Sequence, residues 1–391
     1  MKEPLSVYIH IPFCVRKCRY CDFFSAPCGD TQRKAYTAAL VREIREYPLL
    51  PEDPAYAESG KYDIVSVYIG GGTPSVLKTE ETESILAAVF DRFGITDPGQ
   101  CEITMEINPG TVTPEDLHAL RQAGINRLSV GVQSFNDSEL ALLGRIHTAA
   151  DACAALDAAK RAGFENISLD LIGALPGQTM PEYMYSVKRA VSLKPQHISV
   201  YSLIIEPGTV FAGMLEENRL PELPDEDTER QMAYDCQRYL EENGYRRYEI
   251  SNYSLPGYMS RHNTGYWTLR QYRGFGAGAS SLVGETRFTA AADTDGYIRA
   301  VNAGEKIPCT TEHLTQKDRM EEFMFLGLRM RDGVSRTDFE MLFGCSVDEV
   351  YGNVLRRQEE NGLIICCGGR IMLTDHGTDV SNRVMAEFLL D

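Results

Sequence analysis

The stretch YIHIPFCVRKCRYCDFF, residues Tyr8–Phe24, decides the fold, because it joins a short apolar run to three closely spaced cysteines. Cys14, Cys18 and Cys21 follow a C-x3-C-x2-C spacing. Three soft thiolates so close together can bind three corners of a cuboidal 4Fe–4S cluster and leave its fourth iron open. Zinc or plain buried thiols are the alternatives, although structural zinc usually needs a second close pair of ligands.

Composition and charge narrow the class of protein. The chain has 391 residues, is 43% hydrophobic and carries a net charge of −17. These values predict a large core and disfavour unaided binding to nucleic acid or to an anionic membrane. No apolar run reaches the ~18 residues of a transmembrane segment, and we expect no signal peptide. We therefore expect a cytoplasmic protein whose eleven cysteines are reduced.

Strand-like and helix-like patterns alternate over the first half of the chain. Strands are expected over Leu5–His10, Ile64–Gly70, Glu102–Asn108, Arg127–Val132, Ile167–Ile172 and His197–Leu203. Amphipathic helices are expected over Thr31–Tyr47, Thr79–Phe93, Pro114–Ala123, Thr148–Ala162 and Met180–Leu193. Such alternation predicts an α/β fold in which helices connect parallel strands, and six units predict a partial (β/α)6 barrel.

Glycine-rich and polar residues gather where these strands end. Cys14 follows the first strand, and the run Gly70-Gly71-Gly72-Thr73-Pro74 ends the second. Glu106 lies near the end of the third strand, Gln133 follows the fourth, and Asp170 lies within the fifth. Because the carboxyl-end loops of parallel strands build the active site of a barrel, we expect these residues to share one rim.

The pattern changes after about Pro207 and suggests three domains. We expect a partial barrel over 1–214, a connecting segment over 215–304 and a C-terminal domain over 305–391. In the last part, three helices precede a hairpin and a final helix, an order that resembles a winged-helix module. This part holds ten Lys and Arg against sixteen Asp and Glu, so we expect it to pack against protein and not against DNA.

The two leading motifs resemble those of the radical S-adenosylmethionine superfamily. CVRKCRYC is similar to its cluster motif, and GGGTP is similar to its methionine-binding segment. YIHIPFC, EINPG, GVQSF and DLIGALPGQT occur in the same order in the oxygen-independent coproporphyrinogen III oxidase-like group. The resemblance implies that S-adenosylmethionine completes the open iron, and that its reductive cleavage gives a radical.

The resemblance also implies which residues contact S-adenosylmethionine. The matching positions are Tyr8, Gly71, Gly72, Thr73, Glu106, Gln133, Arg145 and Asp170. Glu106 would accept hydrogen bonds from the amino group, Arg145 would pair with the carboxylate, and Asp170 would bind a ribose hydroxyl. A flavodoxin or ferredoxin would donate the electron if the radical is used, and binding of a second S-adenosylmethionine stays open.

Two features are similar to HemW-type heme chaperones. Coproporphyrinogen dehydrogenases carry a fourth cysteine two residues after the third, where this chain has Phe23. RHNTGYW, residues Arg261–Trp267, is similar to the motif of the chaperones in which a histidine, here His262, is implicated in heme binding. The resemblance implies transfer of heme to an acceptor protein. Oxidative decarboxylation of coproporphyrinogen III and radical modification of heme are the alternatives, and whether the chain is an enzyme or forms a homodimer is left open.

Overall fold

Six parallel strands form the core of the computed structural model, which describes residues 2–50 and 59–390. They are β1 (Glu3–Ile11), β2 (Tyr62–Gly71), β3 (Glu102–Ile107), β4 (Arg127–Gln133), β5 (Ile167–Gly173) and β6 (His197–Ser202). Each pairs in parallel with the next one along the chain. The predicted partial (β/α)6 barrel is therefore confirmed.

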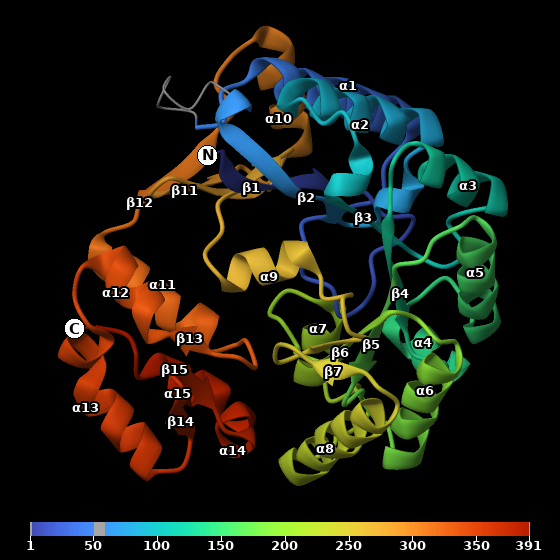
Figure 1. Cartoon of the computed structure of the whole chain (residues 1–391). Helices are drawn as coiled ribbons and strands as arrows, with labels where there is room; N and C mark the ends of the chain where they lie inside the picture. Colours follow the sequence, from blue (N-terminus) through green and yellow to red (C-terminus); the bar gives the residue numbers. More distant parts are fainter. Residues whose placement is uncertain (1, 51–58, 391) are drawn as a thin grey trace.

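Helices connect these strands and cover the outer side of the curved sheet (Figure 1). They are α1 (Asp30–Glu46), α2 (Thr79–Phe93), α3 (Pro114–Gln122), α4 (Asp137–Leu143), α5 (Ala149–Arg161) and α6 (Met180–Ser192). Short 3-10 turns lie at Ser59–Lys61, Pro74–Val76 and Pro98–Gln100. Helix α4 was not predicted, because seven residues are too few to show a helical period.

Residues 210–313, which include the predicted connecting segment, extend the sheet at both edges, and the sequence analysis did not predict this extension. Strands β9 (Tyr272–Phe275), β10 (Ser280–Val283), β11 (Thr286–Ala290) and β12 (Cys309–His313) continue it beyond β1. Strands β7 (Arg246–Arg247) and β8 (Asn252–Ser254) continue it beyond β6. Helices α7 (Val210–Glu216), α8 (Glu226–Glu242), α9 (Arg261–Trp267) and α10 (Thr294–Ala303) complete the segment.

The C-terminal module, defined here as residues 314–390, has its own hydrophobic core. It contains α11 (Gln316–Gly327), β13 (Val334–Ser335), α12 (Arg336–Phe343), α13 (Val347–Glu360), β14 (Ile364–Cys367), β15 (Arg370–Leu373), α14 (Asp375–Asp379) and α15 (Ser381–Ala386). Met324, Phe339 and Ile371 are fully buried in this core. The sequence analysis starts the C-terminal domain at residue 305, but strand β12 pairs with β11 and belongs to the large sheet. This pairing cannot be predicted from the sequence of one strand alone.

Helix α9 lies between the large sheet and the C-terminal module (Figure 1), where it contacts β2 on one side and α11 on the other. Its first turn is fixed by Glu102, whose carboxylate accepts hydrogen bonds from the backbone N–H of Arg261 and His262 at 3.0 and 3.1 Å. An acidic side chain at this position also favours the positive end of the helix dipole. Among the described residues, no helix is both long enough and apolar enough to cross a membrane.

Candidate functional site

The three cysteines lie on the loop that joins β1 to α1. The backbone N–H of Cys14 donates to the Ala26 carbonyl at 3.1 Å, which closes the loop at its base. The Arg16 guanidinium donates to the Gly144 carbonyl at 2.7 Å and ties the loop to the end of α4. The thiols of Cys14, Cys18 and Cys21 are free and line one cavity of about 400 Å³. Cys28 does not line this cavity.

The glycine run at the end of β2 lies directly behind the cysteine loop. Gly71 has φ +117, a backbone conformation that glycine adopts without strain. Gly72 donates to the Ile11 carbonyl at 2.9 Å, and a Cβ at Gly72 would come 3.0 Å from Cys14 Sγ. Thr73 Oγ1 donates to the same sulfur at 3.4 Å. The run therefore lets a ligand reach the backbone beside the thiols.

Glu106 lies beside this run, and the pKa of its carboxyl group is close to neutral pH. Tyr68 donates to its Oε1 at 2.8 Å, and the Gly71 N–H donates to its Oε2 at 3.2 Å. Burial raises the pKa of Glu106 to about 7, although the bond from Tyr68 opposes the rise. The carboxyl can consequently change its charge when a cationic ligand arrives.

We expect Glu106→Gln to stabilise the ligand-free protein increasingly as the pH rises. The pKa of Glu106 in the folded protein lies above its ordinary value of 4.5. Between pH 4.5 and pH 7 the unfolded chain loses the proton while the folded chain keeps it. The wild type therefore loses stability as the pH rises, by roughly 3 kcal/mol at pH 8. Thermal unfolding of both proteins at pH 5 and pH 8 measures this difference, and an equal gap at the two pH values would contradict it.

Arg145 connects the cysteine loop to two strand ends. Its Nη2 donates to Asn108 Oδ1 at 2.7 Å and to the Gly131 carbonyl at 2.6 Å, and its Nη1 contacts Cys18 Sγ at 3.5 Å. Its Nε is buried and has no hydrogen-bond partner among the described residues. A cation so placed, with a donor still free, is suited to bind a carboxylate.

Asp170 and Gln133 complete the far side of the cavity. Ser129 donates to Asp170 Oδ2 at 2.9 Å, and burial raises the pKa of Asp170. Gln133 has φ 68, and the pairing register of β4 and β5 shifts between Gly131 and Gln133. The bulge therefore lies at Gln133, a residue with a strained backbone that lines the cavity. Bulges and strained residues are both common at functional sites.

Tyr8 lies outside this cavity and lines a neighbouring one of about 410 Å³. The two cavities share Phe23, Gly71 and Glu106. The Tyr8 hydroxyl contacts His10 Nδ1 at 2.9 Å, and His10 Nε2 contacts the Phe24 carbonyl at 3.0 Å. The Phe23 side chain is 62% exposed between the two cavities, at the position where a fourth cysteine was sought.

His262 is buried and both of its ring nitrogens are occupied. Nδ1 contacts Ser66 Oγ and Nε2 contacts Tyr266 Oη, each at 2.9 Å. Its ring stacks on that of Tyr68 with 4.8 Å between ring centres, and burial lowers its pKa to about 3. The role of His262 in heme binding stays a prediction. A ring nitrogen that ligated heme would first have to give up Ser66 or Tyr266.

Four residues of the site were not predicted from the sequence. Asn108 and Ser129 hold Arg145 and Asp170, and Tyr68 donates to Glu106. Arg127 is 2% exposed and lines the cysteine cavity, although it is the first residue of β4. The position of Asn108 at the end of a strand was a usable signal, whereas a charge that opens a strand is usually solvent-exposed.

The donor set fits a cuboidal cluster with one open iron. Three free thiols line one cavity, and the glycine backbone leaves room beside Cys14. No three His, Cys, Asp or Glu side chains within residues 2–50 and 59–390 are close enough to share a single metal ion. A cluster binds each thiolate to a separate iron and needs no such convergence, so the geometry gives no support to the zinc alternative.

Comparisons with known proteins agree with this arrangement. The model of the radical SAM superfamily matches residues 8–190, and that of the HemN C-terminal domain matches residues 314–380. The chain is 37% identical to the heme chaperone HemW of Lactococcus lactis over 391 residues, which cover 100% of this chain and 99% of that protein. It is 38% identical to HemW of Bacillus subtilis, covering 98% and 99%. The structure of coproporphyrinogen III oxidase (HemN) from Escherichia coli aligns with a TM-score of 0.83 at 23% identity, over 99% of this chain and 90% of that one.

Proposed function

This chain belongs to the HemW family within the radical SAM superfamily, and from this premise we propose that it binds heme and passes it to an acceptor protein. Membership of the superfamily implies a 4Fe–4S cluster and S-adenosylmethionine. The observation that carries the heme proposal is the similarity to proteins named heme chaperone HemW along the whole chain, α9 included. Four points stay predictions, namely the acceptor protein, an electron donor such as flavodoxin or ferredoxin, a homodimer and a cytoplasmic location.

The residues of the cavity have separate roles in this proposal. Cys14, Cys18 and Cys21 hold the cluster, and Arg145 and Glu106 bind the carboxylate and the amino group of S-adenosylmethionine. Asp170, which lines the same cavity, binds a ribose hydroxyl, as the family resemblance implies. Gly71, Gly72, Thr73 and Gln133 shape the space between them, and Tyr8 closes the adjoining cavity. When bound, the two cofactors supply one-electron radical chemistry.

His262 acts in this proposal as a positioning residue for Tyr266. Ser66 Oγ donates to Ser6 Oγ at 2.9 Å, so it accepts from His262 Nδ1–H. His262 Nε2 is then the acceptor for the Tyr266 hydroxyl. The imidazole thus fixes the Tyr266 side chain of α9 in place. A substitution at His262 affects heme binding by displacing Tyr266.

Reconstituted protein is expected to bind heme with a shifted Soret band and to release it to apomyoglobin as a test acceptor. We expect His262→Ala to weaken heme binding about tenfold, because the loss of the buried hydrogen bond that holds the Tyr266 hydroxyl costs roughly 1.4 kcal/mol. His118→Ala, at an exposed histidine of α3, serves as the control. Absence of a Soret shift in the wild type would refute the proposal.

Decarboxylation of coproporphyrinogen III is the competing function to be tested, because this chain shares the fold of HemN. An anaerobic assay with reductant, S-adenosylmethionine and coproporphyrinogen separates the two on the same protein sample. We expect recovery of the unchanged substrate and, in parallel, of intact heme. Formation of protoporphyrinogen over many turnovers would replace the chaperone proposal with an enzymatic one.

A further inference from the structure

A third and larger cavity lies between the sheet and the C-terminal module. Its volume is about 830 Å³, twice that of the cysteine cavity, and its walls come from α8, β6, β8, α9 and α14. Tyr253, Tyr266 and Trp267 give it aromatic walls. A cavity of this size between two parts of a protein is a usual place for a bound organic molecule.

Polar groups without hydrogen-bond partners line this interdomain cavity. The Arg329 guanidinium lies over the Trp267 ring at 4.4 Å from the ring centre, and its Nη2 is 3.8 Å from Glu249 Oε2. Trp267 Nε1, Arg329 Nε and Glu249 Oε2 are buried and accept or donate no hydrogen bond among the described residues. Glu249 is 1% exposed. Burial of these atoms without hydrogen bonds costs free energy, and a polar ligand that bonds to them would offset that cost.

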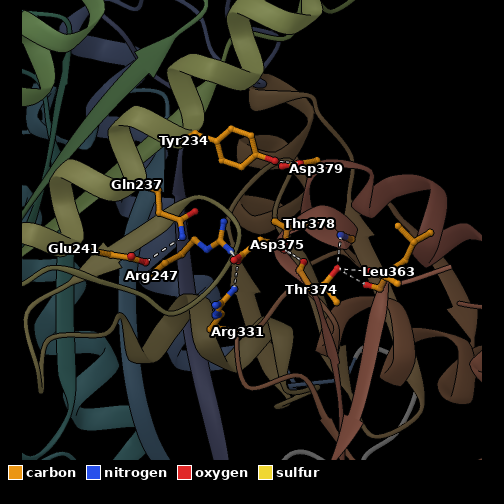
Figure 2. A network of polar contacts seen from close by, with 12 residues as sticks. Tyr234, Gln237, Glu241, Arg247, Arg331, Leu363, Thr374, Asp375, Thr378 and Asp379 are labelled. Carbon is orange, nitrogen blue, oxygen red and sulfur yellow. Dashed lines mark hydrogen bonds and ion pairs between the residues drawn. The ribbon is translucent and has the colours of Figure 1, made fainter. Parts of the chain in front are cut away.

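The rim of the cavity is held by contacts between the two parts of the protein (Figure 2). The Tyr234 hydroxyl of α8 donates to the Asp379 carboxylate of α14. Asp375 accepts from Arg247 of β7 at 3.3 Å and from Arg331 of the C-terminal module at 2.6 Å. Arg247 therefore already binds a carboxylate at the rim of the cavity. Because Asp375 is largely exposed, this ion pair is weak and a carboxylate of a ligand can replace Asp375.

We propose that this interdomain cavity holds the heme, with the macrocycle against Trp267 and one propionate in the place of Asp375 at Arg247. The inference rests on the proposed function and adds the location of the ligand. The aromatic walls match a flat macrocycle. Three arginines and five carboxylates line the cavity, so a propionate binds by replacing one of these carboxylates, Asp375, at Arg247. Asn263 lines both this cavity and the cysteine cavity, so one helix, α9, touches both ligands.

A variant that fills the cavity tests the proposal. Ala233 is an exposed residue of α8 that lines it, and Ala233→Trp would occupy space the macrocycle needs. We expect heme titration to show at least tenfold weaker binding with the cluster absorbance unchanged. Gln231→Trp, at an exposed position of α8 that does not line the cavity, is the matched control and should bind heme as the wild type does. Equal heme affinity in Ala233→Trp and the wild type would overturn the location.

Hydrogen–deuterium exchange of the wild type with and without hemin gives a test that needs no variant. We expect added hemin to slow exchange in α8 and α14. Slowing confined to the segments around Tyr8 and Phe24 and to β10, which border the cavity of about 410 Å³, would place heme there. That result would overturn the location and leave the proposed function intact. Absence of heme binding to the wild type would instead defeat the proposed function itself.

Discussion

Replacing Cys14, Cys18 or Cys21 by alanine is expected to remove the 4Fe–4S cluster. Each thiolate binds its own iron, so the loss of one leaves two anchors for a cluster that already has an open corner. The three thiols line one cavity, and no fourth cysteine of the described chain joins them there. The visible charge-transfer absorbance of anaerobically reconstituted protein should fall by at least tenfold in each variant.

Cys28→Ala is the matched control for this experiment. Cys28 lies on the same loop and is partly buried like the other three, but it does not line the cavity. Its pKa is raised by burial, as expected for a thiol that packs against the core. Iron content and absorbance should match the wild type, and loss of the cluster in Cys28→Ala would contradict the assignment of ligands.

Gly72→Ala is expected to weaken binding of both cofactors although it adds only one methyl group. The new Cβ would lie 2.6 Å from the Phe13 carbonyl oxygen and 3.0 Å from Cys14 Sγ. The oxygen belongs to the backbone, so it cannot rotate away, and the end of β2 must separate from the cysteine loop. We expect cluster content to fall severalfold and affinity for S-adenosylmethionine, measured by calorimetry, to fall about a hundredfold.

Gly29→Ala separates this steric effect from a general cost of replacing glycine. Gly29 precedes α1 with φ −88, and a Cβ there meets nothing within 4 Å. An alanine before a helix costs about a kcal/mol or less relative to glycine, so cofactor binding should not change. Normal binding of S-adenosylmethionine by Gly72→Ala would show that the glycine run does not contact it.

Local patterns in the sequence were enough to predict the barrel and the strand ends that build one site, and the family resemblance added Arg145. The predicted strand over Ile167–Ile172 and helix over Thr79–Phe93 agree with β5 and α2 within one residue. Because parallel strands place their carboxyl ends on one rim, the cysteines, Glu106 and Arg145 come together around one cavity. Tyr8 lies just outside it, since its side chain faces the adjoining cavity.

Contacts between distant segments were beyond prediction. Strand β9 pairs in parallel with β1 across more than 260 residues, and no feature of either strand names its partner. His262 was expected to bind heme because RHNTGYW resembles the motif of the heme chaperones. Its burial depends on Ser66 in β2, which lies 196 residues away. The interdomain cavity likewise depends on how α8 and α14 meet.

Electron paramagnetic resonance of the reduced, reconstituted protein tests the central claim most directly. The claim is that three cysteines hold a 4Fe–4S cluster whose open iron faces the Gly71–Gly72 backbone and binds S-adenosylmethionine. Spectra are recorded before and after S-adenosylmethionine is added to one sample. We predict one 4Fe–4S cluster per chain and a signal that changes on the addition. Zinc in place of iron, or a cluster signal that S-adenosylmethionine leaves unchanged, would contradict it.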